Sequence, residues 1–324
     1  MMKHLASLIT SLSLFLAAAA PASQTPNTFM PVTWQSPLLK DHPLVGQIIA
    51  LESQRSLSPT ELVSELSQYP IVLIGEKHDN ADHHQIETWL IQQLYPSDSA
   101  NTSLVLEMLD DSQTTNTIIS GMSDSDLKQR LNWQDDSWPW QDYGPLIKAA
   151  LEQNMPVHSG NISRDTIHTI YKAGVPKTQR FASTQGITQA VKDQVLDQVY
   201  ESHCQLMPRS QLAPMVSVQL ARDASLAYAI KQRSTDNVIL VAGGFHTDKS
   251  VGVPLHLSPV EQQHTRTILL MEVDAAHEQG QDYTTLSKAD YVWFTPKANN
   301  TNYCDDLRQQ WQKKSPSHVK SKDG

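Results

Sequence analysis

The sequence predicts an α/β fold in which a mostly parallel sheet is flanked by helices. Four short apolar segments have the length and composition of buried parallel strands, and each is followed by polar or glycine residues. Segments with helical periodicity lie between them, and this alternation of strand and helix is typical of layered α/β proteins. The four segments are residues 71–74, 103–106, 155–157 and 238–241.

The helices are predicted from their apolar periodicity. The first, residues 85–94, places Ile86, Leu90 and Leu94 on one face, and looser helical segments follow the second strand. Two longer helices are predicted between the third and fourth strands, and we expect them to form a helical lobe of the same domain. These two helices, and a further apolar run that is expected to extend the sheet, cover residues 189–200, 215–231 and 267–273.

The two ends of the chain are expected to lie outside this domain. Residues 1–22 combine a basic start, an apolar stretch and small residues at the end, as a secretory signal peptide does. No cysteine stands near the cleavage point, so there is no lipobox and a soluble periplasmic protein is predicted. The expected divisions are a signal peptide at 1–22, an N-terminal segment at 23–44, one domain at 45–305 and a basic, disordered tail at 306–324.

The charge of the chain excludes one class of partner. The formal net charge is -9, and removing the signal peptide takes away Lys3 and no acidic residue, so it becomes -10. A chain this acidic is not expected to bind nucleic acid.

The only two cysteines are Cys204 and Cys304. In an oxidising compartment, a pair separated by a long loop most simply forms one structural disulfide. Thiolate ligation of a metal or haem is the alternative, and the sequence lacks the C-x-x-C spacing that would favour it. We therefore expect a disulfide between Cys204 and Cys304.

Polar side chains are expected to converge at one edge of the sheet. In open α/β sheets, the ligand crevice lies outside the carboxyl ends of the strands. Imidazole and carboxylate groups together suit zinc, manganese or iron better than calcium or magnesium. The residues that follow the four predicted strands are Glu76 and His78, then Glu107, then His158 and Asn161, and finally His246.

Three interpretations of this edge are open. A divalent transition metal held by His78, Glu107 and His246 would activate a water molecule for hydrolysis. Without a metal, Glu107 would orient His78 as a general base. In the third interpretation, these groups only bond one another and close the sheet edge, although four polar strand ends together favour a functional crevice. The nearby Asp82 and His84 are expected to form a solvated first helical turn, with Asp82 helping to cap it.

Several motifs, taken in their order along the chain, resemble the ChaN-type haem-binding uptake family of the Tiki/TraB superfamily. The opening block is Leu-Ile-Gly-Glu-Lys-His-Asp-Asn at residues 73–80, with two histidines soon after it. The resemblance extends roughly from residue 45 to residue 305, and the joint order is more specific than any single motif. The other matching segments are residues 107–108, 138–145, 203–208, 219–224, 243–246, 252–254 and 293–296.

The resemblance implies a haem-binding protein of haem and iron uptake, in which two haems pair face to face across a homodimer. An outer-membrane haem receptor is the implied delivery partner. For the axial ligand the resemblance implies a tyrosine, and phenolate ligation of haem iron has precedent. Tyr143 is the first candidate because Trp138 and Trp140 offer flat rings beside it. The rivals lie near one turn and are His203, Tyr200 and Met207.

The superfamily resemblance also implies an alternative function, metal-dependent hydrolysis. Its motifs are two G-x-x-H sequences, which end at His78 and His246, together with the strand-end Glu107 and the neighbouring Glu76. Arg222 and Asp223 would be supporting charges in that scheme. Two departures from the family pattern stand out: the lipid-bearing cysteine of many relatives is missing, and the bulky Phe245 would narrow a metal site or stack on haem.

Overall fold

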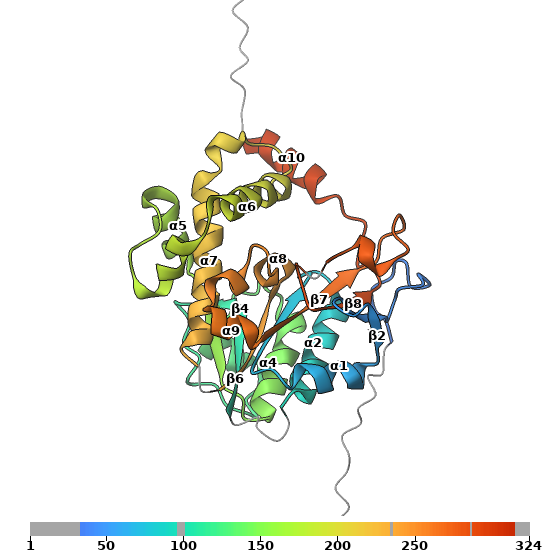
Figure 1. The fold of residues 1–324 in the computed structure, drawn as a ribbon. Helices are drawn as coiled ribbons and strands as arrows, with labels where there is room; N and C mark the ends of the chain where they lie inside the picture. The colour runs from blue at the N-terminus through green and yellow to red at the C-terminus, as the bar shows by residue number, and fades with distance from the viewer. Residues whose placement is uncertain (1–32, 96–100, 234–235, 286, 315–324) are drawn as a thin grey trace, which may run out of the picture.

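The computed structural model describes residues 33–95, 101–233, 236–285 and 287–314. The predicted signal peptide therefore lies outside the described residues, as do residues 315–324 of the predicted tail. The fold is α/β, as expected, with one eight-stranded sheet at its centre and helices around it (Figure 1). The strand order across the sheet is β2-β1-β8-β7-β3-β6-β4-β5.

The sheet is mostly parallel. Strands β3 to β8 pair in parallel, whereas β1 pairs antiparallel with both β2 and β8. Parallel strands that are buried on both faces are nearly continuous apolar runs, which is why the central ones were predictable. The strand bounds are β1 Ile48–Ala50, β2 Arg55–Leu57, β3 Ile71–Glu76, β4 Thr102–Asp110, β5 Val157–Asn161, β6 Asn237–Gly243, β7 Thr265–Glu272 and β8 Tyr291–Thr295.

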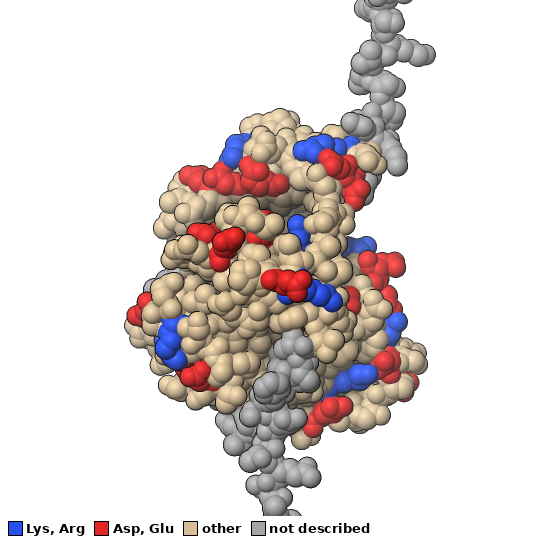
Figure 2. Space-filling model, turned by 90° about the vertical axis from the view of Figure 1, so that its right-hand side faces the viewer, with Lys and Arg blue, Asp and Glu red and all other residues tan. Residues whose placement is uncertain are grey.

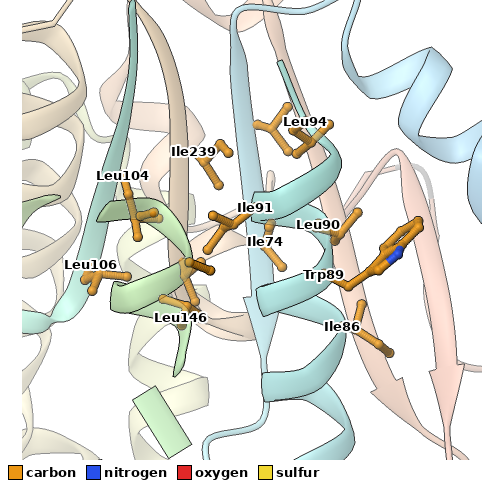
Figure 3. Packing of buried hydrophobic residues seen from close by; sticks show 14 of the residues in the cluster. Ile74, Ile86, Trp89, Leu90, Ile91, Leu94, Leu104, Leu106, Leu146 and Ile239 are labelled. Carbon is orange, nitrogen blue, oxygen red and sulfur yellow. The ribbon is translucent and has the colours of Figure 1, made fainter. Parts of the chain in front are cut away.

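Two cores cover the two faces of the sheet. Alternate strand residues such as Val72 and Ile74 pack against α1, α2 and α4, and Figure 3 shows the apolar side chains of α2 directed at the strands. The intervening residues, such as Leu73, pack against α7 and the short helix η4. The helix bounds are α1 Pro59–Leu66, α2 Ala81–Gln93, α3 Asp124–Leu131, α4 Trp140–Glu152, α5 Arg164–Ala173, α6 Gln189–Ser202, α7 Ala213–Lys231, α8 Gly244–Thr247, α9 Pro259–Gln263, α10 Tyr303–Lys314 and η4 Val253–His256.

The predicted helical lobe is present between β5 and β6. Helix α6 packs on the first half of α7 through a small core of its own that includes Val195, Val199 and Leu220. Figure 1 shows α7 running from the sheet to the end of the lobe, with α6 and α10 at that end. The long helix α7 thus fixes the lobe to the sheet.

The C-terminal helix α10 is tied to the lobe by the predicted disulfide between Cys204 and Cys304. The helix runs to Lys314, so the segment that we expected to be disordered from residue 306 is helical over its first part. The Asn302 side chain accepts a hydrogen bond from the backbone N–H of Cys304 at 3.2 Å. This side-chain cap and the covalent bond hold a helix for which the sequence offers few apolar residues.

The described part of the predicted N-terminal segment belongs to the folded body. Leu38 forms a β-bridge with Lys297 beyond the end of β8, and Leu44 is buried. Within the described ranges, no helix is both long and apolar enough to cross a membrane. On the face seen in Figure 2, basic and acidic side chains are interspersed and no extended basic patch forms, as expected for a chain this acidic.

Candidate functional site

The carboxyl ends of β3, β4 and β6 bring the predicted edge residues together. Glu76 is the last residue of β3 and pairs in register with Gly243, the last residue of β6. Glu107 lies in β4 where its register with β5 shifts, between Leu106 and Asp110. Such an irregularity redirects a side chain out of the regular alternation. Asn161 ends β5 at the same edge, and its amide donates to the carbonyl oxygen of Glu107 at 3.0 Å.

His246 is held between two buried carboxylates. Its Nδ1 lies 2.6 Å from Asp223 Oδ1 on α7, and its Nε2 lies 3.3 Å from Glu107 Oε1. The other oxygen of Glu107 accepts the backbone N–H of Gly243 at 2.8 Å. Burial alone would lower the pKa of His246, but the two carboxylates outweigh it and raise the pKa to about 10. His246 is therefore an imidazolium at neutral pH.

This charge state bears on the predicted metal set of His78, Glu107 and His246. An imidazolium whose two ring nitrogens both face carboxylates would have to release its Nε2 proton before that nitrogen could bind a metal ion. Burial would raise the pKa of Glu107, but His246, His78 and the Gly243 amide lower it, so Glu107 is the counter-ion of His246.

His78 is the edge imidazole that reaches the surface. Its side chain is 40% exposed, and its Nδ1 lies 2.8 Å from Glu76 Oε1. Trp138 packs edge-on against the ring, with centroids 4.9 Å apart. A Cβ atom on Gly243 would lie 2.9 Å from His78 Nε2, so glycine at that position leaves room for the ring. A carboxylate on Nδ1 fixes the imidazole and leaves Nε2 as the nitrogen available to a ligand.

Tyr143 does not lie where the sequence prediction placed it. It is 0% exposed, and its hydroxyl donates to Glu76 Oε1 at 2.9 Å. Burial and the nearby carboxylates, Glu76 first among them, raise its pKa. The neighbouring Trp140 is also buried, because α4 directs this aromatic group into the core against Trp133. Of the predicted aromatic patch, only Trp138 is partly exposed.

The rival haem ligands lie in the lobe. His203 follows α6, and its Nδ1 lies 2.8 Å from the carbonyl oxygen of Val199. Tyr200 and Met207 pack at the border of the lobe core. None of the three is among the residues that line the cavity at the strand ends.

Two further sequence expectations, those for His158 and for the first turn of α2, need correction. His158 lies inside β5 and not after it, because β5 begins later than predicted. Its Nδ1 lies 2.6 Å from a guanidinium nitrogen of Arg233. The first turn of α2 is buried, and Asn80 caps it instead of Asp82. Arg222 donates to Asn161 at 3.3 Å, while its neighbour Asp223 pairs with His246.

Buried polar groups of α2 are the part of the site that the sequence interpretation missed. Asp82 accepts the backbone N–H groups of Gln35 and Ser36 at 2.7 and 3.0 Å. His84 and Glu87 are buried beside Glu76. The spacing could have shown that Glu87 is buried, because Glu87 stands three residues before Leu90 on the helical face that packs on the sheet.

A cavity of about 600 Å³ opens at the strand ends. We call it the strand-end cavity. Phe245, which is 60% exposed, stands at this cavity. The residues that line the strand-end cavity include Lys77, His78, Phe245, Leu269, Met271 and Lys288. An apolar wall with a few polar groups is the usual composition of a small-molecule site.

The comparison with protein families decides the identity of the fold. Residues 62–257 match the family model described as haem-binding uptake, Tiki superfamily, ChaN. The chain belongs to this family. No curated protein matches the chain.

The chain is also similar to solved structures. The chain is similar to ChaN of Campylobacter jejuni, whose structure is described as showing cofacial haem binding. The two share 25% sequence identity with a TM-score of 0.62, over 76% of this chain and 95% of that one. A mutant of the erythromycin esterase EreC in its open conformation also matches, with 13% identity and a TM-score of 0.47, over 80% of this chain and 99% of that one.

Proposed function

We propose that this protein binds haem at the strand-end cavity and takes part in haem or iron uptake in the periplasm. Membership of the ChaN family and the likeness to a protein with cofacial haem binding support the proposal. The observation that carries it is the partly exposed His78, whose ring is fixed by a buried carboxylate beside an open, largely apolar cavity.

The residues around the cavity fit a large, flat and mostly apolar ligand. Its volume of about 600 Å³ lies within the range of about 300–1,000 Å³ that ligand pockets have. Phe245 offers an exposed ring face, Met271 an adaptable apolar side chain, and Lys288 a cation for a haem carboxylate. His78 is the side chain at this cavity that is best placed to contact the iron.

The axial ligand can be assigned by haem titration. We expect a Soret band when haem is added to the purified protein, and we expect it to shift or weaken in His78→Ala, which removes the imidazole. Tyr143→Phe removes one oxygen and keeps the packing, so it tests the phenolate that the family resemblance implies. His203→Ala is the matched control on the lobe.

A Soret band that changes in Tyr143→Phe but not in His78→Ala would assign the iron to the phenolate. That result would also mean that Tyr143 leaves its place beside Glu76 when haem binds. A change in His203→Ala alone would move the site to the lobe.

We further propose that two haem-loaded copies pair across a twofold axis. A haem held at an open cavity keeps one face in water, and an isologous contact buries that face on both copies. Sedimentation velocity should therefore show a dimer with haem and a smaller species without it, because ligand binding at the contact stabilises the dimer by mass action. Phe245→Ala should weaken this haem-dependent dimer.

The control for this test is Ile119→Ala, since Ile119 is 63% exposed and is not among the residues that line the cavity. A fully haem-loaded monomer would contradict the pairing. The periplasmic location and an outer-membrane haem receptor as partner belong to the same proposal, and cell fractionation tests the location.

A further inference from the structure

We propose a second ligand site in this protein, a buried site for a divalent transition metal ion formed by Glu76, His84 and Glu87. Each side chain offers one ligand atom, and these atoms all lie within 4.8 Å of one another. Glu76 comes from the end of β3, and the other two come from the first half of α2. All three residues are buried.

The state of Glu87 is the first observation behind the site. The residue is 0% exposed, and neither carboxylate oxygen has a hydrogen-bond partner among the described residues. A buried carboxylate without a partner is costly, so buried charges are usually paired or coordinate a metal. Burial and the nearby Glu76 raise the pKa of Glu87, so this carboxyl group holds either a proton or a cation at this place.

The neighbours of Glu87 contact each other. His84 Nε2 and Glu76 Oε2 lie 2.9 Å apart as an ion pair, and neither atom makes a further hydrogen bond within the described chain. Three side chains thus direct ligand atoms at a common space, and a bound ion would take the place of the contact between His84 and Glu76. Ligand atoms about 2.1 Å from a zinc ion lie at most about 4.2 Å apart, so small side-chain rotations would close the set.

Glu76 is oriented for this role by two donors. Its Oε1 accepts from the Tyr143 hydroxyl at 2.9 Å and faces His78 Nδ1 at 2.8 Å, which leaves Oε2 directed at His84. Hydrogen bonds to the second oxygen of a carboxylate are a common way to fix a metal ligand. One imidazole and two carboxylates suit zinc, manganese or iron(II), and two negative charges balance a divalent ion.

An ion would have a route to this site that avoids the strand-end cavity. His84 also lines a separate cavity of about 400 Å³, together with Gln85, Thr88, Gln141 and Asp142. Asp142 Oδ1 lies 3.9 Å from His84 Nδ1, on the side of the ring away from Glu76. The carboxylate of Asp142 is thus placed to attract a cation and to orient the imidazole.

The test uses haem-free protein that has been stripped of metal with a chelator. Equilibrium dialysis with zinc alone should give one tightly held zinc ion per chain, and zinc should raise the melting temperature by mass action. Glu87→Gln should weaken zinc binding more than about 100-fold, and Asp142→Asn about tenfold, as outer-shell changes do. Glu65→Gln removes a partly buried carboxylate that pairs with Arg55 and accepts the Tyr291 hydroxyl, and serves as the matched control.

Two results would overturn the site. One is wild-type protein that holds no zinc after dialysis, in which case Glu87 keeps a proton in place of a cation. The other is zinc binding that survives both Glu87→Gln and Asp142→Asn and is lost in His78→Ala, which would place the ion in the strand-end cavity. Because Glu87→Gln keeps the size and polarity of the side chain, its melting temperature without zinc should not fall, and Asp142→Asn remains a test if it does.

Discussion

His246→Ala is expected to lower the free energy of unfolding by about 3–5 kcal/mol, because it leaves two buried carboxylates without their cation. Asp223 and Glu107 are both almost fully buried and both face the His246 ring. Urea denaturation of the metal-free protein measures the change. A double-mutant cycle with Asp223→Asn should show strong coupling, since the second change partly relieves the charge that the first leaves behind.

The same network predicts a pH dependence. The pKa of His246 is raised from 6.5 to about 10 in the folded protein, so its contribution to stability is complete below about pH 6.5 and is lost as the pH rises to about 10. The difference in stability between wild type and His246→Ala should therefore shrink between pH 7 and pH 10. A difference that stays constant over this range would mean that His246 is neutral in the fold.

Removal of the disulfide is expected to have a similar effect on stability. A loop of 100 residues separates Cys204 from Cys304, and closing a loop of that length contributes up to about 4.7 kcal/mol through chain entropy. The double variant Cys204→Ser with Cys304→Ser should therefore unfold at a much lower urea concentration. Reduced wild-type protein is the matched control, and its unfolding midpoint should agree with that of the double variant.

An unchanged midpoint in the double variant would show that the disulfide contributes nothing to stability. Hydrogen exchange gives the local result, because without the covalent bond the amides of α10 are expected to exchange much faster. The amides of β3 should keep their protection, since β3 lies inside the sheet between β6 and β7 and the bond joins α10 to the lobe.

The central strands could be predicted because burial on both faces requires continuous apolar runs, and Ile71–Glu76 and Asn237–Gly243 have them. Their polar ends could be predicted for the same reason, since the runs stop at Glu76 and Gly243. Strands β1 and β2 have three residues each, too few to show a period. They form because β8 pairs with β1 in antiparallel orientation, so their formation depends on contacts between distant parts of the chain.

The fine structure of the site was out of reach for a related reason. A tyrosine that follows two tryptophans is compatible with a surface and with a core, and only the packing of α4 decides that Tyr143 bonds to Glu76. Glu87, in contrast, stands on an apolar helical face, and its place could have been predicted. A charged residue at a core position predicts a buried polar group, and the sequence interpretation did not use that signal.

The disulfide also closes a covalent ring in the chain. The ring runs from Cys204 through α7, β6, β7 and β8 and returns to Cys304 in α10. Strand β3 lies outside this ring in sequence, yet it is inserted between β6 and β7, which both belong to it. Cys304 lies in α10, after the last strand of the sheet. We therefore expect β3 to enter the sheet before the ring closes. Oxidation would then be one of the last steps of folding, and it would lock a strand order that is already complete.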